Sequence, residues 1–536
     1  MRVGRHSWVL LFLILFFVNA PSVFAQAAYQ AQVRGTVTDQ SGAMVVNATV
    51  TITNDATGIA QTTHTDDHGQ YFLVGLRPAT YSIKTESPGF RTTERKDIVL
   101  QVDQQTSVDF VLHPVGVSQT MEVTEAAPLL DTDSATLGTE ITSEYVKEIP
   151  LINRSFFGLT FLSGGVTEAA GSGTTDNYPT GTNFVSNGQR NATAEVRLDG
   201  ALISAPEQGE GGNSNIYYEP IVEGVQEFKV QNNSFSAEFG NNGGTVVNMV
   251  LKSGTNAFHG SGWYFLQRSD LNARDFFNPA PNPKPDALRD QGGFSLGGPI
   301  RKNKTFFFVD FEKVRNNAAI SGLASVPTMA ERQANPDFSA NTQSDGVTPI
   351  NIYDPKMVCS GGTRPQVGFD CSGTQIGTPN VIPASEVDPL GQAILNLYPQ
   401  PNVDGAGEFN NYLFSGTAHA PDYQFDIKID HQINDRNRIA GRYSRAKSDF
   451  KTPIFLGDGG LANGGSINDG IGGSPTTAQN TSLEYTWTVN PRIIWTSRVA
   501  LSFYWSWLGF LPMCGALGAY LSRRAIRIPG KLRNRV

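Results

Sequence analysis

The chain has 536 residues, and its 49 Asp and Glu outnumber its 41 Lys and Arg, so its formal net charge is −8 at pH 7. This balance provides no basic field for nucleic acid, and a nucleic-acid-binding function is disfavoured. With 55 Gly, 30 Pro and only 17% charged residues, the composition suits a β-rich protein with many loops, and the length exceeds what a single domain usually holds.

The N-terminus has the pattern of an export signal. Arg2 and Arg5 precede an apolar run over residues 8–18, and Val23-Phe24-Ala25 offers small residues at the cleavage positions. The competing interpretation is an uncleaved anchor helix, but the apolar run is shorter than the roughly 20 residues needed to cross a bilayer. We therefore predict a signal peptide at residues 1–25 and release of the mature protein from the inner membrane.

Residues 31–114 alternate short apolar runs with turn residues, which predicts a small β-sandwich. The clearest expected strands are Gln32–Thr38, Ala48–Thr53, Tyr71–Val74, Tyr81–Thr85, Ile98–Val102 and Ser107–Leu112. The most distinctive motifs are Val33-Arg34-Gly35-Thr36-Val37-Thr38-Asp39, Asp67-x-Gly69-Gln70-Tyr71-Phe72, Leu76-x-Pro78-x-x-Tyr81 and Gly89-Phe90. With these motifs the segment resembles the carboxypeptidase regulatory-like domain, a transthyretin/prealbumin-like sandwich. Tyr71, Phe72 and Tyr81 are expected in its core rather than in a ligand site.

The sequence offers little for catalysis. It contains no nucleophile elbow, metalloprotease helix, phosphate loop or Cys-x-x-Cys pair. His64 and His68 are four residues apart beside Asp66 and Asp67, as in some metal sites, but the turn leading into Gly69 favours a solvated loop. We therefore expect neither an enzyme nor a bound cofactor or metal.

Residues 115–255 combine an expected helix at Ser143–Glu148 with short strands and glycine-rich loops. The motifs of this segment are Ile149-Pro150-Leu151-Ile152-Asn153-Arg154-Ser155-Phe156, Asn187-Gly188-x-Arg190, Leu198-Asp199-Gly200, Glu227-Phe228-Lys229-Val230 and Lys252-Ser253-Gly254-Thr255-Asn256. Together they resemble the α+β plug of TonB-dependent outer-membrane receptors, and the Oar-like branch in particular.

This resemblance implies a partner and a set of contacts. The partner is the TonB energy-transducing complex, which would pair with a short strand before the plug, and Met121-Glu122-Val123-Thr124 is the nearest candidate, although any extended tetrad would look the same. Arg154 and Arg190 would hold the plug in a polar lumen through charge-assisted hydrogen bonds to barrel carboxylates. Solvated surface arginines are the alternative for both.

Residues 256–504 alternate short turns with long loops, as transmembrane β-barrels do. The expected strands are Phe258–Gln267, Gln291–Ile300, Lys304–Val314, Asp422–Ile433, Arg438–Ala446, Asn480–Val489 and Ile493–Tyr504. In the fourth, apolar Tyr423, Phe425, Ile427 and Ile429 alternate with polar Gln424, Asp426, Lys428 and Asp430, which indicates a lipid face opposite a wet face. A soluble β-sandwich alternates in the same way, but the one-sided loop lengths favour a partial transmembrane antiparallel barrel in outer-membrane lipid.

The longest loop contains two of the three cysteines. Cys359 and Cys371 could pair in an oxidising compartment, and closing so short a loop contributes about 3 kcal/mol in the chain-entropy model. A metal site would need two further ligands, and neither Cys has a His close by. We therefore expect a disulfide, with Cys514 left unpaired.

Residues 505–536 depart from the pattern. They do not alternate, the last part is basic, and Val536 is not the terminal aromatic residue that members of the family usually carry. Receptor barrels have about 22 strands around a plugged lumen, against seven expected here. A frameshifted reading frame, a fragment and a transmembrane helix near Leu501–Leu521 all remain open, with the frameshift favoured.

The sequence thus predicts a mainly β, exported outer-membrane receptor with a periplasmic sandwich, a plug and part of a barrel, which captures and imports an unidentified siderophore, saccharide or peptide. Two alternatives stay open. One is a surface adhesion protein or scaffold that binds carbohydrate or protein without transport. The other is a non-functional truncated product.

Overall fold

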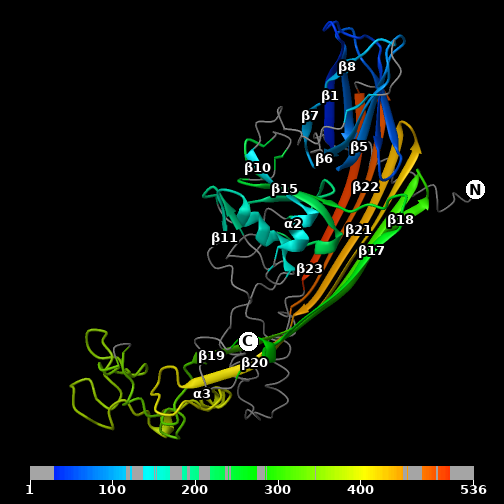
Figure 1. Ribbon diagram of the computed structural model, residues 1–536. Coiled ribbons are helices and arrows are strands. Elements are labelled where there is room, and N and C mark those ends of the chain that lie inside the picture. Colours follow the sequence, from blue (N-terminus) through cyan, green and yellow to red (C-terminus); the bar gives the residue numbers. More distant parts are fainter. Residues whose placement is uncertain are drawn as a thin grey trace, which may run out of the picture.

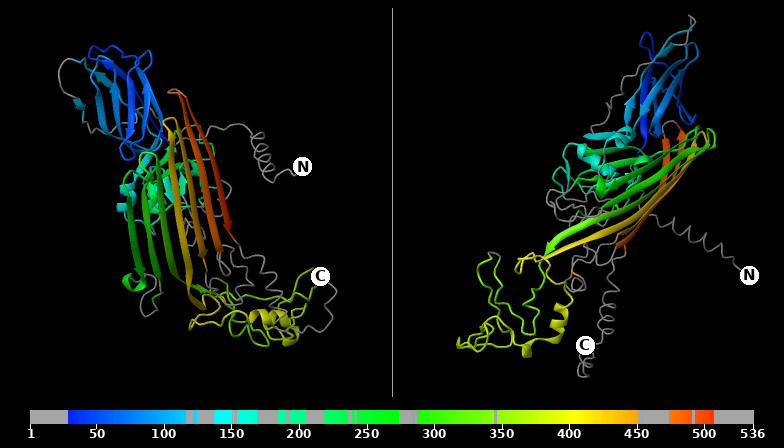
Figure 2. Two further views of the ribbon diagram at one scale, coloured as in Figure 1. Left: turned by 90° about the vertical axis from the view of Figure 1, so that its right-hand side faces the viewer. Right: turned by 60° about the horizontal axis from the view of Figure 1, so that its bottom comes forward.

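The computed structural model describes residues 29–115, 121–123, 137–149, 151, 154–168, 184–189, 193–204, 216, 218–235, 239–240, 243–273, 284, 287–343, 346–450, 456, 474–490 and 493–506. The chain forms a sandwich, a plug and a long curved sheet (Figure 1). The plug lies against the concave face of the sheet, and the sandwich lies at one end of both (Figure 2). The predicted signal peptide and Cys514 fall outside the described residues.

The sandwich consists of two sheets around one apolar core. Its strands are β1 (Ala31–Asp39), β2 (Thr49–Asn54), β3 (Ala60–His64), β4 (Gln70–Leu76), β5 (Ala79–Glu86), β6 (Thr93–Leu100), β7 (Gln105–Ser107) and β8 (Phe110–Leu112). One sheet has the order β4-β1-β7 with β8 also paired to β1, and the other has β3-β2-β5-β6-β9, where β9 is Met121–Val123. Alternate residues of the strands point into the core, which contains Val33, Ile52, Leu73 and Ile83.

Three details of the sandwich differ from the expectation. Strand β3 was missed because its sequence, AQTTH, has no apolar run. The expected strand Ser107–Leu112 is split into β7 and β8, since the Asp109 carboxylate accepts hydrogen bonds from the Thr36 N–H and hydroxyl and interrupts the ladder. Phe72, expected in the core, is 42% exposed because it follows the buried Tyr71 in a strand whose side chains alternate.

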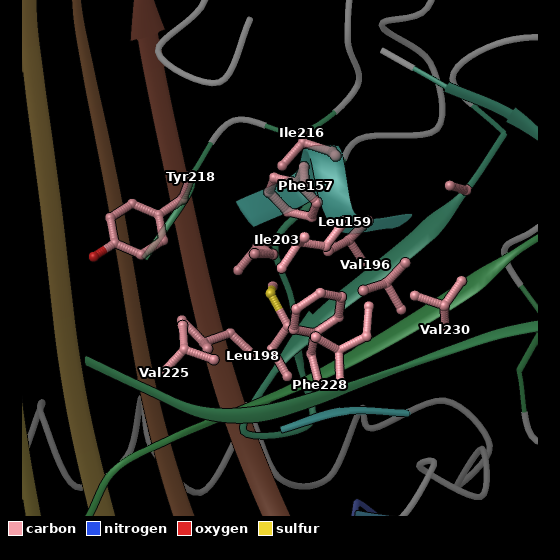
Figure 3. Close-up of a cluster of buried hydrophobic side chains, with 14 of the residues drawn as sticks. Phe157, Leu159, Val196, Leu198, Ile203, Ile216, Tyr218, Val225, Phe228 and Val230 are labelled. Atoms are coloured by element: carbon pink, nitrogen blue, oxygen red, sulfur yellow. The ribbon is translucent and has the colours of Figure 1, made fainter. Parts of the chain in front are cut away.

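The plug contains a five-stranded sheet of order β10-β15-β16-β13-β14. Its elements are β10 (Leu137–Thr142), α2 (Ser143–Glu148), η2 (Phe156–Leu162), β11 (Val166–Glu168), β12 (Phe184–Ser186), β13 (Glu195–Leu198), β14 (Ala201–Leu202), η4 (Val222–Gly224), β15 (Val225–Asn233) and β16 (Val246–Leu251). The helix has the predicted bounds. Side chains from the sheet and η2, together with Ile216 and Tyr218, form one buried cluster (Figure 3). Strand β16 is buried along its whole length, as a central strand should be.

The curved sheet is an antiparallel meander of seven strands, in the order predicted. They are β17 (His259–Arg268), β18 (Leu288–Arg301), β19 (Thr305–Ala324), β20 (Tyr412–Asn434), β21 (Asn437–Phe450), β22 (Ser474–Asn490) and β23 (Ile493–Ser506), with η5 (Ser269–Leu271) after β17. The two expected faces of β20 are confirmed, since Ile427 is 40% exposed whereas Asp426 and Lys428 are buried against the plug. Among the described residues, β17 and β23 each have one neighbouring strand, so the barrel is not closed.

Strands β19 and β20 are much longer than expected. Beyond the predicted ends at Val314 and Asp422, ten further residue pairs continue the ladder, from Arg315 opposite Pro421 to Ala324 opposite Tyr412. This two-stranded arm carries the longest loop, with η6 (Ala384–Glu386) and α3 (Pro389–Leu395). In this loop Cys359 and Cys371 form a disulfide, the pairing expected from the sequence.

No helix in the part of the chain that the structure describes is long and apolar enough to span a membrane. The transmembrane helix considered from the sequence near Leu501–Leu521 overlaps β23. Residues 501–506, which would be its first six, belong to that strand. The remaining residues of that segment and of the tail, from 507 onward, lie outside the described part of the chain.

The lipid-facing assignment of β20 predicts a depth-dependent cost for a charge. Ile427 lies near the middle of the stretch that pairs with β21, and Ile433 lies on the same face near the short turn. We expect Ile427→Lys to reduce the free energy of unfolding from lipid vesicles by about 2–4 kcal/mol and Ile433→Lys by less than about 1 kcal/mol, because the interface hydrates the ammonium group. Equal costs at the two positions in a urea titration would contradict the assignment.

Candidate functional site

The motif Leu198-Asp199-Gly200 forms the tip of a hairpin in the plug. Strands β13 and β14 are joined by the two-residue turn Asp199-Gly200, whose φ angles are 48° and 74°. Positive φ at both central residues is the requirement of a type I′ turn, which Asp-Gly meets well. The turn places the Asp199 side chain at the surface of the plug that faces the curved sheet.

Two cations of the sheet enclose the Asp199 carboxylate. Lys428 Nζ on β20 lies 3.0 Å from Asp199 Oδ1, and Arg442 Nε on β21 lies 3.3 Å from Asp199 Oδ2. All three residues are at least nine-tenths buried. Lys428 also donates to the Leu251 carbonyl at 2.9 Å, and Arg442 donates to the Leu198 carbonyl at 3.2 Å. The plug is therefore held to the concave face by a buried, hydrogen-bonded ion pair, which we call the Asp199 clasp.

A second polar contact lies beside the clasp. Tyr218 projects its hydroxyl away from the apolar cluster of the plug toward the strands of the sheet (Figure 3), where it donates to Asp426 Oδ2 at 2.7 Å. Burial raises the pKa of Tyr218 well above its usual value, so the phenol remains a donor. Asp310 packs against Gly224 of the plug so closely that a Cβ there would lie 2.1 Å from Asp310 Oδ2. The sheet thus approaches the plug backbone directly.

Arg498 on β23 connects all three parts of the chain. Its guanidinium donates to Glu484 Oε2 of β22 at 2.5 Å and to the Gly200 carbonyl of the plug at 3.2 Å. The same group lies 5.2 Å from the ring centroid of Tyr29, just before β1 of the sandwich. Tyr29 and Gln30 donate to Glu484 Oε1 at 3.3 Å and 3.1 Å.

The sandwich makes a further ion pair with the sheet. Arg77, between β4 and β5, is bonded to Asp430 of β20, and both side chains are largely buried. Near this pair a cavity of about 670 Å³ lies where the sandwich, plug and sheet meet, with Lys304, Arg436 and Arg438 among the residues of its wall. A cavity of this volume at a junction of domains has the size of small-molecule sites.

The sandwich also contacts the plug through strand β15. Gln226 donates to the Pro78 carbonyl at 2.8 Å, Gln231 donates to Asp103 Oδ2 at 2.7 Å, and the Glu227 carboxylate accepts from the Val102 N–H. Burial, with the nearby charge of Glu140, raises the pKa of Glu227 to about 8. A proton on this carboxyl group therefore stabilises the contact near neutral pH.

The predicted site residues have different outcomes. Arg154 is ion-paired with Glu223, which belongs to the plug itself, and its contact with the sheet is to the ring of Phe265, whose centroid lies 4.0 Å from Arg154 Cζ. Arg154 thus lies at the boundary of plug and sheet, where its charge also interacts with the Glu312 carboxylate of β19. Arg190 lies outside the described residues.

The candidate TonB-binding segment has a partner within the chain. Met121–Val123 forms β9, which pairs in parallel with β6 of the sandwich, with Met121 opposite Thr93 and Val123 opposite Arg95. Thr124 lies outside the described residues. His64 and His68 are exposed, and the Asp66 carboxylate accepts from the His68 and Gln70 N–H groups, as in a turn.

The residues of the clasp were not predicted as a site. Asp199 was visible only as part of a motif, and Lys428 only as one of several polar residues on the wet face of β20. The available signal was a Lys on the inward face of a strictly alternating strand. Because Lys is almost never fully buried without a partner, this position indicates a buried ion pair. Glu484 was likewise visible only as one of several polar residues on one face of its strand, and Arg442 and Arg498 carried no distinguishing local pattern.

Comparison with known proteins identifies the parts. Residues 250–509 match the family described as outer membrane beta barrel domain, and residues 32–113 match the carboxypeptidase regulatory-like domain. The chain is 29% identical over 329 residues to the TonB-dependent transporter Oar of Myxococcus xanthus. The chain is thus similar to TonB-dependent outer-membrane transport proteins, with an outer membrane beta barrel domain and a carboxypeptidase regulatory-like domain. The aligned residues are 58% of this chain but only 29% of Oar.

Solved structures with a similar arrangement include two siderophore receptors. The ferric enterobactin receptor PfeA of Pseudomonas aeruginosa is 12% identical, with a TM-score of 0.39 over 70% of this chain and 41% of PfeA. The siderophore receptor PirA of Acinetobacter baumannii is 12% identical, with a TM-score of 0.38 over 70% of this chain and 40% of PirA. Residues 250–509, which match the outer membrane beta barrel domain, include the whole curved sheet, so the sheet is the wall of an outer-membrane barrel and its concave face is the lumen.

Removing the charge of Asp199 should loosen the plug. Asp199→Asn keeps the shape of the side chain but leaves Lys428 and Arg442 buried without their counter-charge, and breaking a buried pair in this way costs about 3–5 kcal/mol. We expect the free energy of local opening, measured by hydrogen exchange of the β13 and β16 amides, to fall by that order. Asp404→Asn in the exposed loop is the control. Equal protection in the two variants would show that the clasp does not hold the plug.

The contact of Glu227 should weaken as the pH rises. The pKa in the folded protein, about 8, lies above the ordinary value of 4.5, so the folded state holds a proton that the unfolded state releases. Stability from this group is fully present below pH 4.5 and is lost as the pH rises through 8, at a rate of up to about 1.4 kcal/mol per pH unit. Glu227→Gln should therefore gain thermal stability relative to wild type between about pH 5 and pH 9, whereas the exposed Glu148→Gln should not. A constant difference across this range would contradict the raised pKa.

Proposed function

We propose that the receptor takes up a ligand through the outer membrane in a TonB-dependent way. The observation that carries this proposal is the Asp199 clasp. A plug held to the lumen wall by ion pairs and hydrogen bonds can exchange them for water as it moves, whereas a plug held by apolar packing would expose apolar surface. The contact therefore suits a plug that must be displaced and seated again.

The orientation follows from the loops. The short turns of the barrel wall lie at the end where the sandwich sits, and short turns face the periplasm in this class of barrel. We place the sandwich in the periplasm and the arm of β19 and β20 outside the cell. TonB would then reach the segment Met121–Thr124 from the periplasmic side by adding a strand to it. Within the described part of the chain β9 is an edge strand paired with β6, so its second edge can receive the added strand.

The ligand class stays open among siderophores, saccharides and peptides. A second function, adhesion without transport, is favoured by one observation. The arm projects beyond the sheet and carries a loop fastened by a disulfide and by Arg332, which donates to the carbonyls of Pro327, Leu395, Tyr398 and Pro399. Such a fastened, projecting loop suits capture of a surface molecule. Binding to whole cells that persists without TonB, with no accumulation inside, would identify adhesion.

A proline in the candidate segment tests the role of TonB. Val123→Pro removes a backbone donor and should weaken binding of the purified C-terminal domain of TonB at least about tenfold, equivalent to about 1.4 kcal/mol. Asp131→Pro, eight residues further along the chain, is the control and should bind as wild type does. Equal binding by both variants would place the TonB-binding segment elsewhere, and uptake unaffected by loss of TonB would overturn the proposed function itself.

A further inference from the structure

The sandwich covers the plug at the periplasmic end of the lumen. In the views of Figures 1 and 2 it lies across the short-turn ends of the strands and beside the plug sheet. The Asn256 N–H donates to the Ala56 carbonyl at 3.0 Å, and the Asn256 side chain donates to the Thr57 carbonyl at 2.8 Å, so the β2–β3 turn rests on the start of the barrel. Displacement of the plug toward the periplasm is thus opposed by the sandwich.

Two contacts hold the sandwich to the lumen wall rather than to its rim. Arg77 is ion-paired with Asp430, which is 6% exposed, and Tyr29 and Gln30 bind Glu484, which is 4% exposed. Both carboxylates belong to the face of the sheet that also receives the plug. We call these two contacts the sandwich latch.

The latch and the Asp199 clasp share the wall. Lys428, which binds Asp199, and Asp430, which binds Arg77, are neighbours on the same face of β20. Arg498 binds Glu484 of the latch and the Gly200 carbonyl of the clasp hairpin. The plug and the sandwich are therefore held by one continuous set of buried charges.

The numbers of buried cations and anions in this set determine what happens to the ion pairs when the plug moves. The set contains five cations, namely Arg77, Lys428, Arg438, Arg442 and Arg498, and four anions, namely Asp199, Asp426, Asp430 and Glu484. When the plug withdraws Asp199, three anions remain for five cations. Lys428 can then pair with Asp430 in place of Arg77. The excess positive charge also repels the Arg77 guanidinium and weakens its ion pair with Asp430.

We propose that the sandwich is a lid over the plug, and that the plug controls it by withdrawing Asp199, which releases Arg77 from Asp430. This proposal rests on the proposed function only in giving the lid a purpose, namely to block the periplasmic exit until the plug moves. The coupling is reciprocal, so release of the sandwich also loosens the clasp.

A double-mutant cycle with a crosslink between sandwich and barrel tests the coupling. The pair Ala56→Cys and Asn256→Cys, in a Cys514→Ser background, forms a disulfide only while the sandwich is docked, since a backbone hydrogen bond joins these two positions. Asp199→Asn should reduce the yield of this crosslink about fivefold, the lower end of typical couplings. When Arg77→Met is also present, Asp199→Asn should reduce the yield less than about twofold, because the repelled charge is absent.

The controls separate the lid from general damage and from transport. Asp404→Asn should leave the yield unchanged, and hydrogen exchange of β16 reports whether the plug remains folded. If Asp199→Asn reduces the crosslink yield by the same factor with and without Arg77→Met, the proposal is overturned. An unchanged crosslink yield in Asp199→Asn also overturns it. The purified protein is tested without TonB or ligand, so failure here leaves the proposed uptake standing, and failure of the uptake test leaves the coupling standing.

Discussion

A carboxylate enclosed between two protein surfaces is stable only where cations and hydrogen-bond donors replace its water, and this requirement determines how the plug is seated. Asp199 meets it with Lys428 and Arg442, which come from adjacent strands of the wall. Each of these cations is in turn buried, and Asp199 is the carboxylate that ion-pairs with both. The plug and the wall therefore each supply part of the environment that holds these side chains.

Several features of the plug and the wall place the Asp199 carboxylate between its two cations. The type I′ turn presents Asp199, and the alternation of β20 and β21 directs Lys428 and Arg442 into the lumen while Ile427 faces outward. The wall can approach the plug closely because Gly224 has no side chain in the way of Asp310. Apolar packing in the plug then supplies a rigid base for these contacts, with Phe157 and Phe228 fully buried.

The long loop between β19 and β20 is stabilised by different means. It lies away from the plug, and the described clusters of buried apolar side chains do not include it. The disulfide of Cys359 and Cys371 fastens one part, and Arg332, which donates to four carbonyls, gathers another around α3. Asn411 closes the base by exchanging two hydrogen bonds of 2.8 Å with the backbone of Val326. Local polar contacts and the disulfide thus replace an apolar core in a loop whose large apolar side chains, such as Ile376 and Leu390, remain exposed.

The sequence by itself determined the features that have a local period. The pattern of short turns and long loops identified all seven wall strands, side-chain alternation identified both faces of β20, and α2 was predicted with the bounds that the structure shows. It missed β3, the division between β7 and β8, and the ten added pairs of β19 and β20, because these depend on hydrogen bonds to a neighbouring strand rather than on hydrophobic pattern. Only the tertiary structure decided the clasp and the latch. Lys428 and Asp199 are 229 residues apart, and Arg77 and Asp430 are 353 apart, so no local pattern could pair them. The physical reason is that a charge in a sequence does not indicate which opposite charge will share its burial.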